Sequence, residues 1–122
     1  GLTSTTVVDG TGLDAGSLST ASELAQLGRL ALENPVLAEL LTTRPTDTAA
    51  GTAFVDQSTF VADLGTVGLS RSYTDAAGVC VLLAVPAGDE TVVVVLLDAP
   101  DRWWSAARLI DDAFAALAES RC

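Results

Sequence analysis

The spacing of hydrophobic residues in the first third of the chain predicts two consecutive helices. Thr20 can cap the first helix, because Glu23 follows three residues later in the arrangement of a capping box. Apolar positions at helical spacing continue to Glu33, after which Asn34-Pro35 interrupts them and opens a shorter helix. We expect the shorter helix to bury one apolar side, formed by Val36, Leu37, Leu40 and Leu41.

The second half of the chain has the alternation and composition of β-strands. Three runs rich in β-branched residues, 67–73, 79–85 and 91–98, predict three strands. The Pro-Ala-Gly-Asp segment 86–89 separates the last two and is typical of a hairpin loop. The run 92–97 is apolar on both faces, so the third strand requires cover above and below.

A last helix is predicted from about Pro100 to near Ser120, laid back across the strands. Pro100 suits the first helical position, and Asp98 lies where a cap is needed. We expect Trp103 and Phe114 to be buried against the sheet. They belong to an apolar stripe at helical spacing that consists of Trp103, Ala107, Ile110, Phe114 and Leu117.

Irregular segments join these elements. Residues 5–8 form a short extended run, and the Asp-Gly-Thr-Gly segment 9–12 turns the chain out of it. Residues 42–53 show no periodicity and predict a loop.

This order of elements predicts an α+β fold, with a three-stranded antiparallel sheet and a C-terminal helix packed on it. The length of 122 residues allows one domain at most, or part of one. We divide residues 1–122 into a helical segment, 1–45, and a segment of sheet plus terminal helix, 66–122.

The hydrophobic content suggests that this domain is partial. Hydrophobic residues make up 49% of the chain and its mean hydropathy is +0.43, so few polar residues remain for the surface. We therefore expect another surface to cover some apolar area. The edge of strand 91–98 is the candidate, and it could pair with a second copy in a homodimer or with an upstream chain.

The charge excludes several classes of function. The formal net charge is −10, from 16 acidic and 6 basic residues, and every basic residue is Arg. Nucleic-acid binding is not expected without basic clusters. The absence of Lys and His removes the commonest general bases and metal ligands, so neither a metal site nor a cofactor is expected. No apolar run approaches the ~20 residues of a membrane-spanning helix, so no transmembrane segment is expected.

Acidic pairs and cysteines are the remaining candidates for chemistry. Asp111 and Asp112 are adjacent on a predicted helix and point about 100° apart, which is typical of a solvated face rather than of an acid–base pair. Cys80 and Cys122 could form a disulfide if the chain is exported, or stay free if it is cytosolic.

Four segments, in chain order, resemble one protein family. They are GLTSTT with GTGLD in residues 1–14, STASELA with Asn-Pro in residues 19–35, GLSRSYTDAAGVC in residues 68–80, and the DAP-initiated segment 98–114. Together they resemble the C-terminal part of the low-molecular-mass D-alanyl-D-alanine carboxypeptidases, which are serine penicillin-binding proteins of the bacterial envelope. The resemblance implies a partial β-lactamase/transpeptidase-like fold, an extracytoplasmic location (cell envelope or secreted) and a peptidoglycan peptide as ligand.

The same resemblance shows which catalytic groups this chain lacks. The family's Ser-x-x-Lys nucleophile motif would lie upstream of Gly1, and a chain without Lys cannot hold that pair. The family's Lys-Thr-Gly strand motif falls on residues 70–72, where the substrate-facing cation is replaced by Ser70. Arg71 would face away from Ser70, because side chains alternate along a strand. The substrate-binding residues carried over from the family are Ser70, Arg71, Ser72, Tyr73 and Thr74, and no catalytic residue is carried over.

Two functions follow from the resemblance. The first is a catalytically inactive carboxypeptidase-like segment, a pseudoenzyme that acts as a scaffold or interaction module in the peptidoglycan context. The alternative is the C-terminal part of a functional serine-type D-Ala-D-Ala carboxypeptidase whose nucleophile lies on an upstream segment. A third interpretation, an unrelated small α+β binding domain, is disfavoured by the four matches in order.

Overall fold

The computed structural model describes residues 1–42, 67–101 and 103–120, so the loop predicted over residues 42–53 lies almost wholly outside it. The described elements form an α+β fold, as predicted, with helices first, three antiparallel strands next and a helix last. The elements are α1 (Ala21–Glu33), α2 (Pro35–Thr42), β1 (Val67–Thr74), β2 (Gly78–Ala87), β3 (Glu90–Ala99) and α4 (Trp103–Ser120).

The two N-terminal helices begin where the sequence predicts. The Thr20 side chain accepts a hydrogen bond from the Glu23 amide at 3.2 Å, which caps α1. Asn34 ends α1 with an extended backbone, and its Oδ1 accepts hydrogen bonds from the amides of Val36 and Leu37. One asparagine therefore separates the helices and caps the second of them.

Two hairpins build the sheet, with the strand order β1-β2-β3. The β2–β3 loop has two residues, and its first, Gly88, has a φ of 70°. A positive φ at this position is what the tight hairpin turns require, since their twist matches that of the strands. The register pairs Val81 with Leu96 and Leu83 with Val94, so alternate residues of β2 and β3 share a face.

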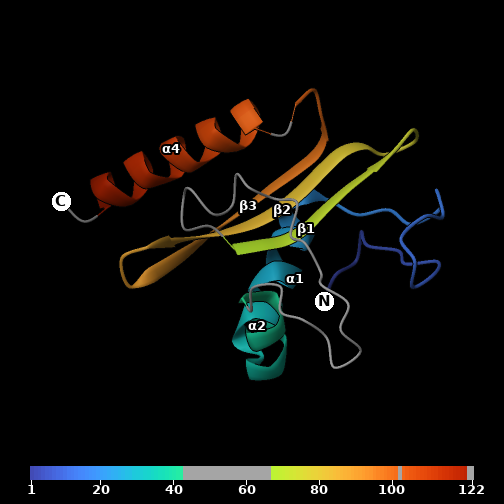
Figure 1. Ribbon diagram of the computed structural model, residues 1–122, viewed down its shortest axis with the longest axis horizontal. Helices are drawn as coiled ribbons and strands as arrows, with labels where there is room; N and C mark the ends of the chain where they lie inside the picture. The colour runs from blue at the N-terminus through green and yellow to red at the C-terminus, as the bar shows by residue number, and fades with distance from the viewer. Residues whose placement is uncertain (43–66, 102, 121–122) are drawn as a thin grey trace, which may run out of the picture.

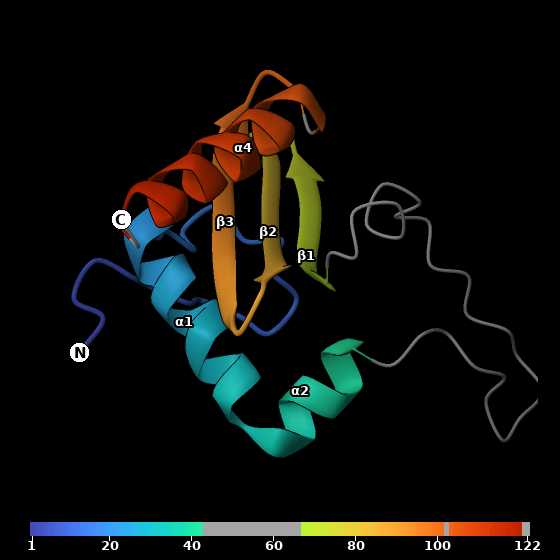
Figure 2. The same cartoon turned by 90° about the vertical axis from the view of Figure 1, so that its left-hand side faces the viewer.

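Helices cover both faces of the sheet, as the two-sided apolar pattern of the third strand predicts. Figure 1 shows α4 on one side and α1 with α2 on the other, and Figure 2 shows the same layers from the side. The helix α4 contacts β3, α1 contacts β3 and β2, and α2 contacts β1.

The core lies between α4 and the sheet. Its buried side chains come from alternate positions of the two inner hairpin strands and from one face of the helix: Val81, Leu83, Val85, Val94, Leu96, Ala106 and Ile110. Burial of each large aliphatic side chain here stabilises the fold by about 1.5–3 kcal/mol relative to exposure. This core holds the strands that form the floor of the cleft described below.

The start and packing face of α4 differ from the prediction. The helix begins at Trp103 rather than Pro100, and its first turn is bound by Asp101, whose carboxylate accepts hydrogen bonds from the amide and hydroxyl of Ser105. Asp98 belongs to β3 and is not the cap. Ala106 rather than Ala107 lies fully buried at the centre of the face, and Phe114 is 38% exposed.

This shift has a simple cause. The face that meets the sheet runs through Ala106 and Ile110, which are one turn apart, and Phe114 lies toward its margin. The Trp103 side chain, also predicted to be buried, lies outside the described part of the structure.

The predicted buried side of α2 is largely exposed. Val36 and Leu40 are 64% and 68% exposed, Leu37 is also exposed, and Leu41 is partly buried. Among the described elements, α2 packs against α1 and β1, which cover too little of an eight-residue helix to bury these side chains. Apolar area is thus left on the surface, as the composition predicts.

Candidate ligand-binding cleft

A cavity of about 430 Å³ lies between the N-terminal segment, α1 and the face of the sheet opposite α4. Its walls are mainly apolar, with hydroxyl groups and carboxylates at their margins. The lining residues include Thr5, Val7, Asp9, Ser17, Leu18, Ser19, Leu24, Leu27, Ser70, Ser72, Cys80, Leu82, Leu97 and Asp98.

The strand β1 supplies two of these hydroxyls. Ser70 is paired with Leu82 and Ser72 with Cys80 across the β1–β2 ladder, and all four residues line the cleft. Residues directly opposite each other on neighbouring strands point to the same face. Ser70 and Ser72 therefore share the cleft face of β1, as the alternation of side chains along a strand requires.

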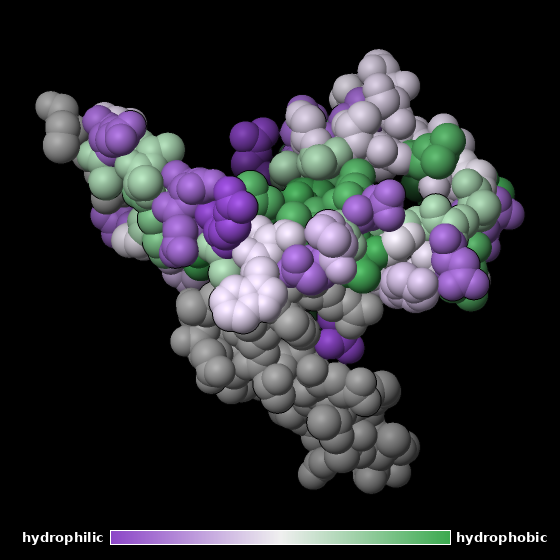
Figure 3. Space-filling view, turned by 90° about the horizontal axis from the view of Figure 1, so that it is seen from above, coloured by the Kyte–Doolittle hydropathy of each residue, from purple (hydrophilic) through white to green (hydrophobic). Residues whose placement is uncertain are grey.

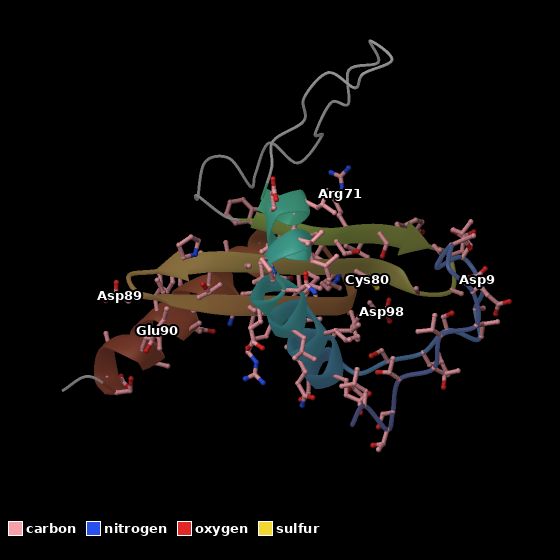
Figure 4. All side chains as sticks on the ribbon, turned by 90° about the horizontal axis from the view of Figure 1, so that it is seen from below. Asp9, Arg71, Cys80, Asp89, Glu90 and Asp98 are labelled. Carbon is pink, nitrogen blue, oxygen red and sulfur yellow. The ribbon has the colours of Figure 1, made fainter. Side chains whose placement is uncertain are left out.

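Arg71 lies on the opposite side of β1, as the alternation predicts. Arg71 is paired with Val81, whose side chain belongs to the core beneath α4. The Arg71 side chain does not line the cleft. In Figure 4 its guanidinium lies away from Cys80 and Asp98. The cation next to the two serines therefore cannot contact a ligand that they hold.

Tyr73 and Thr74, the other residues carried over from the family, are the last two residues of β1 and lie beside the turn over residues 75–77. The Ala77 amide donates to both the carbonyl and the Oγ1 of Thr74, at 3.2 and 3.1 Å. The exposed Tyr73 hydroxyl donates to Asp75 at 3.3 Å. These side chains stabilise the turn, and neither one lines the cleft.

Glu23 fixes the N-terminal wall of the cleft. Its carboxylate accepts hydrogen bonds from the amides of Thr3 and Ser4, each at 2.9 Å, and from the Thr5 hydroxyl. The bond from Thr5, followed by that from the Ser4 amide, lowers the pKa of Glu23 below its ordinary value. The capping box is thus only half formed, because this carboxylate binds the N-terminal segment rather than the Thr20 amide.

A loop closes the same wall. Thr6 and Leu18 exchange backbone hydrogen bonds at 2.8 and 2.9 Å, which brings the two ends of the loop together. At its tip Asp9 accepts hydrogen bonds from the Thr11 hydroxyl and from the amides of Thr11 and Gly12. The Thr11 hydroxyl is the main cause that lowers the pKa of Asp9. The predicted turn over residues 9–12 is confirmed, and its carboxylate is held in place.

Asp98 lies in a strained part of β3 at the border of the cleft. Its φ is 48°, in the left-handed region that non-glycine residues rarely adopt, and the β2–β3 register shifts beside it, between Val79 and Val81. Gly78 lies opposite, with a φ of 64°, and a Cβ there would come within 2.2 Å of an Asp98 carboxylate oxygen. Only glycine therefore fits at position 78.

Cys80 lies on the cleft face of β2 and is partly buried. Its Sγ donates a weak hydrogen bond to the Ala77 carbonyl at 3.4 Å. Cys122 lies outside the described residues, so the Cys80–Cys122 disulfide stays a prediction.

The cleft suits a neutral or cationic ligand better than an anionic one. Two acidic side chains, Asp9 and Asp98, border it, and the residues that the structure places along it include no basic side chain. Its serines and threonines have no adjacent Lys or His, because the chain contains neither. A serine hydroxyl without a base is a poor nucleophile at neutral pH.

Sequence reasoning found the β1 part of this cleft and missed the rest. Strand alternation was sufficient to place Ser70 and Ser72. Glu23 carried a local signal, the capping box, which gave no indication that its carboxylate binds residues 3–5. Asp98 was assigned to a helix cap because Pro100 follows it two residues later.

Comparisons with protein-family models, with curated proteins and with solved structures found no match to this chain. Within the described residues, no helix combines the length and apolar character that crossing a membrane requires.

Proposed function

We propose that this chain is a catalytically inactive D-alanyl-D-alanine carboxypeptidase-like segment that acts in the cell envelope as a scaffold or interaction module. The proposal rests on the four family-like segments and on the order of elements that carries them. Segment 68–80 supplies β1, its turn and the start of β2, and segment 98–114 contains the start of α4.

The observation that carries the proposal is the arrangement of residues 70–72. Ser70 and Ser72 line the cleft, whereas Arg71 is on the other face of the strand. In the resembled enzymes a lysine on this strand would present its cation to the substrate carboxylate. Here a peptide with a free C-terminal carboxylate would meet two hydroxyls and the carboxylates of Asp9 and Asp98 instead.

Inactivity follows from the same residues. Acyl transfer to a serine needs a base that removes the hydroxyl proton, and this chain offers neither Lys nor His for that role. Donors aimed at a developing oxyanion are a further requirement, and the cleft margins carry two acidic side chains that would repel such a charge. Binding or scaffolding remains as the role for the cleft.

The test is labelling of the purified chain with a fluorescent penicillin, read on a denaturing gel, together with D-alanine release from a diacyl-D-Ala-D-Ala peptide. We expect neither a covalent label nor released D-alanine, with a known carboxypeptidase as positive control. A label that disappears in the Ser70→Ala or Ser72→Ala variant would overturn the proposed inactivity and support the alternative, a functional carboxypeptidase part.

A further inference from the structure

The cleft is large enough for a small molecule, and its walls are mainly apolar. Its volume of about 430 Å³ falls within the roughly 300–1,000 Å³ of typical small-molecule sites. Apolar surface alone selects no ligand, because the chain also exposes hydrophobic residues elsewhere, as Figure 3 shows on the face seen from above. The polar groups at the margin of the cleft must therefore determine which ligand fits.

The N-terminal wall of the cleft uses backbone donors for its own structure. The amides of Thr6 and Leu18 donate to each other's carbonyl groups. The Gly12 amide donates to the Asp9 carboxylate. These residues all line the cleft, so three of its amide donors are already engaged and do not bind a ligand that needs donors.

The hydroxyl groups of the same wall direct their protons toward Glu23. Its ionised carboxylate can only accept, so the Thr5 hydroxyl is the donor to it. Thr5 has one hydroxyl proton, so Ser19 must be the donor in the 2.8 Å contact between the two hydroxyls. The alternative acceptor for Ser19, the Thr20 carbonyl, is farther away at 3.4 Å. The Ser19 oxygen therefore offers the cleft lone pairs rather than a proton.

Two carboxylates complete the margin of the cleft, Asp98 from β3 and Asp9 from the N-terminal loop. Among the described residues, no donor is paired with the Asp98 carboxylate, which lies against Gly78. Hydrogen bonds from its own turn hold Asp9 in the ionised form and lower its pKa. The described lining includes no basic side chain. The margin is therefore rich in acceptors and negative charge.

We infer that the cleft binds a small amphiphilic amine, with its ammonium group at this acceptor-rich margin and its apolar body against Leu24, Leu27 and Leu82. An ammonium group has donors and no acceptor, which matches the groups that the margin presents. The hydroxyls of Ser70 and Ser72 can accept from it as well. A ligand carboxylate would find no cation here. The inference rests on the proposed function in one respect, that the cleft binds without catalysing a reaction.

The test is an NMR titration of the full chain with three ligands that share a phenyl ring and differ in charge. They are phenethylammonium, phenethyl alcohol and phenylpropanoate. At neutral pH and low salt we expect the amine to bind at least about three-fold more tightly than the alcohol and about ten-fold more tightly than the carboxylate. Amide signals of Ser70, Ser72 and Cys80 should shift, whereas that of Ile110 in α4 should not.

Two variants separate the margin of the cleft from general electrostatics. Asp98→Asn should weaken binding of phenethylammonium about three- to five-fold, because one negative charge is lost and asparagine tolerates the left-handed backbone. Its binding of phenethyl alcohol should stay within about two-fold, which shows that the cleft is still folded. Asp89→Asn removes the same charge at the hairpin end of the sheet, far from Asp98 in Figure 4, and should leave both affinities within about two-fold.

The inference is wrong if phenylpropanoate binds as tightly as the amine, if no ligand shifts the cleft amides, or if the two variants weaken amine binding equally. Penicillin labelling tests the proposed inactivity separately. Amine selectivity without a label supports both proposals, and a label together with amine selectivity overturns the inactivity alone. Loss of amine selectivity without a label overturns this inference alone.

Discussion

At the scale of single residues, one carboxylate joins the N-terminal wall of the cleft to the first helix. Glu23 accepts hydrogen bonds from three consecutive residues, 3–5, while its own amide is bound by Thr20. These bonds favour the ionised carboxylate, which is why the pKa of Glu23 is lowered in the folded chain.

The sign of this shift predicts an acid-sensitive attachment of residues 3–5. Because the pKa of Glu23 is lowered in the folded chain, its ionised carboxylate stabilises the fold at pH values above the ordinary glutamate pKa of about 4.3. This stabilisation is lost as the pH falls through the still lower pKa of the folded chain. Glu23→Gln should remove that pH dependence and accelerate amide exchange at Thr3 and Ser4, followed by NMR. Glu33→Gln on the same helix, which breaks only an exposed pair with Arg29, is the control and should change neither amide. Equal effects of the two variants would contradict the assignment.

A second residue-scale prediction concerns Gly78. Its positive φ and the closeness of Asp98 leave no room for a side chain, so Gly78→Ala should destabilise the fold by about 1–3 kcal/mol in urea unfolding. Gly10→Ala is the matched control, because a Cβ at Gly10 meets nothing within 4 Å, and it should change stability by no more than about 0.5 kcal/mol. A Gly78→Ala variant as stable as Gly10→Ala would show that β3 relaxes freely at Asp98.

At the scale of elements, α4 packs against the sheet through a narrow face of the helix. Ile110 is 4% exposed in the core, whereas Leu109, its neighbour on the same helix, is 42% exposed. Ile110→Ala should therefore destabilise the fold by about 2–5 kcal/mol, and Leu109→Ala by less than about 1 kcal/mol. Chemical unfolding of both variants, followed by circular dichroism, distinguishes the two positions. A larger effect at Leu109 would mean that another face of α4 packs on the sheet.

The boundaries and burial of the elements also show which structural features local sequence patterns can predict. Local signals placed the strands within one or two residues, since alternation and turn residues are short-range properties. The burial of Phe114 and of α2 was predicted wrongly, because the exposure of a helix face depends on which surface is present to cover it. No local pattern contains that information.

At the scale of the whole molecule, three layers were predictable and the cleft was only partly so. The two-sided apolar third strand required helices on both faces, and α1 and α4 provide them. The cleft combines β1 with residues 5–19, which are far apart in sequence. Their juxtaposition depends on how α1 packs against β2 and β3, which the amphipathic pattern of α1 does not specify.

The sheet β1-β2-β3 and the helix α4 are built from elements that are neighbours in the sequence. Each strand pairs with the next through a short turn, and α4 follows β3 after a few residues. Contacts between residues close in sequence cost little chain entropy to form, whereas the contacts between α1 and β3 join segments that are far apart in the sequence. The sheet and its last helix can therefore assemble early during folding, and the cleft, which needs α1, is completed last.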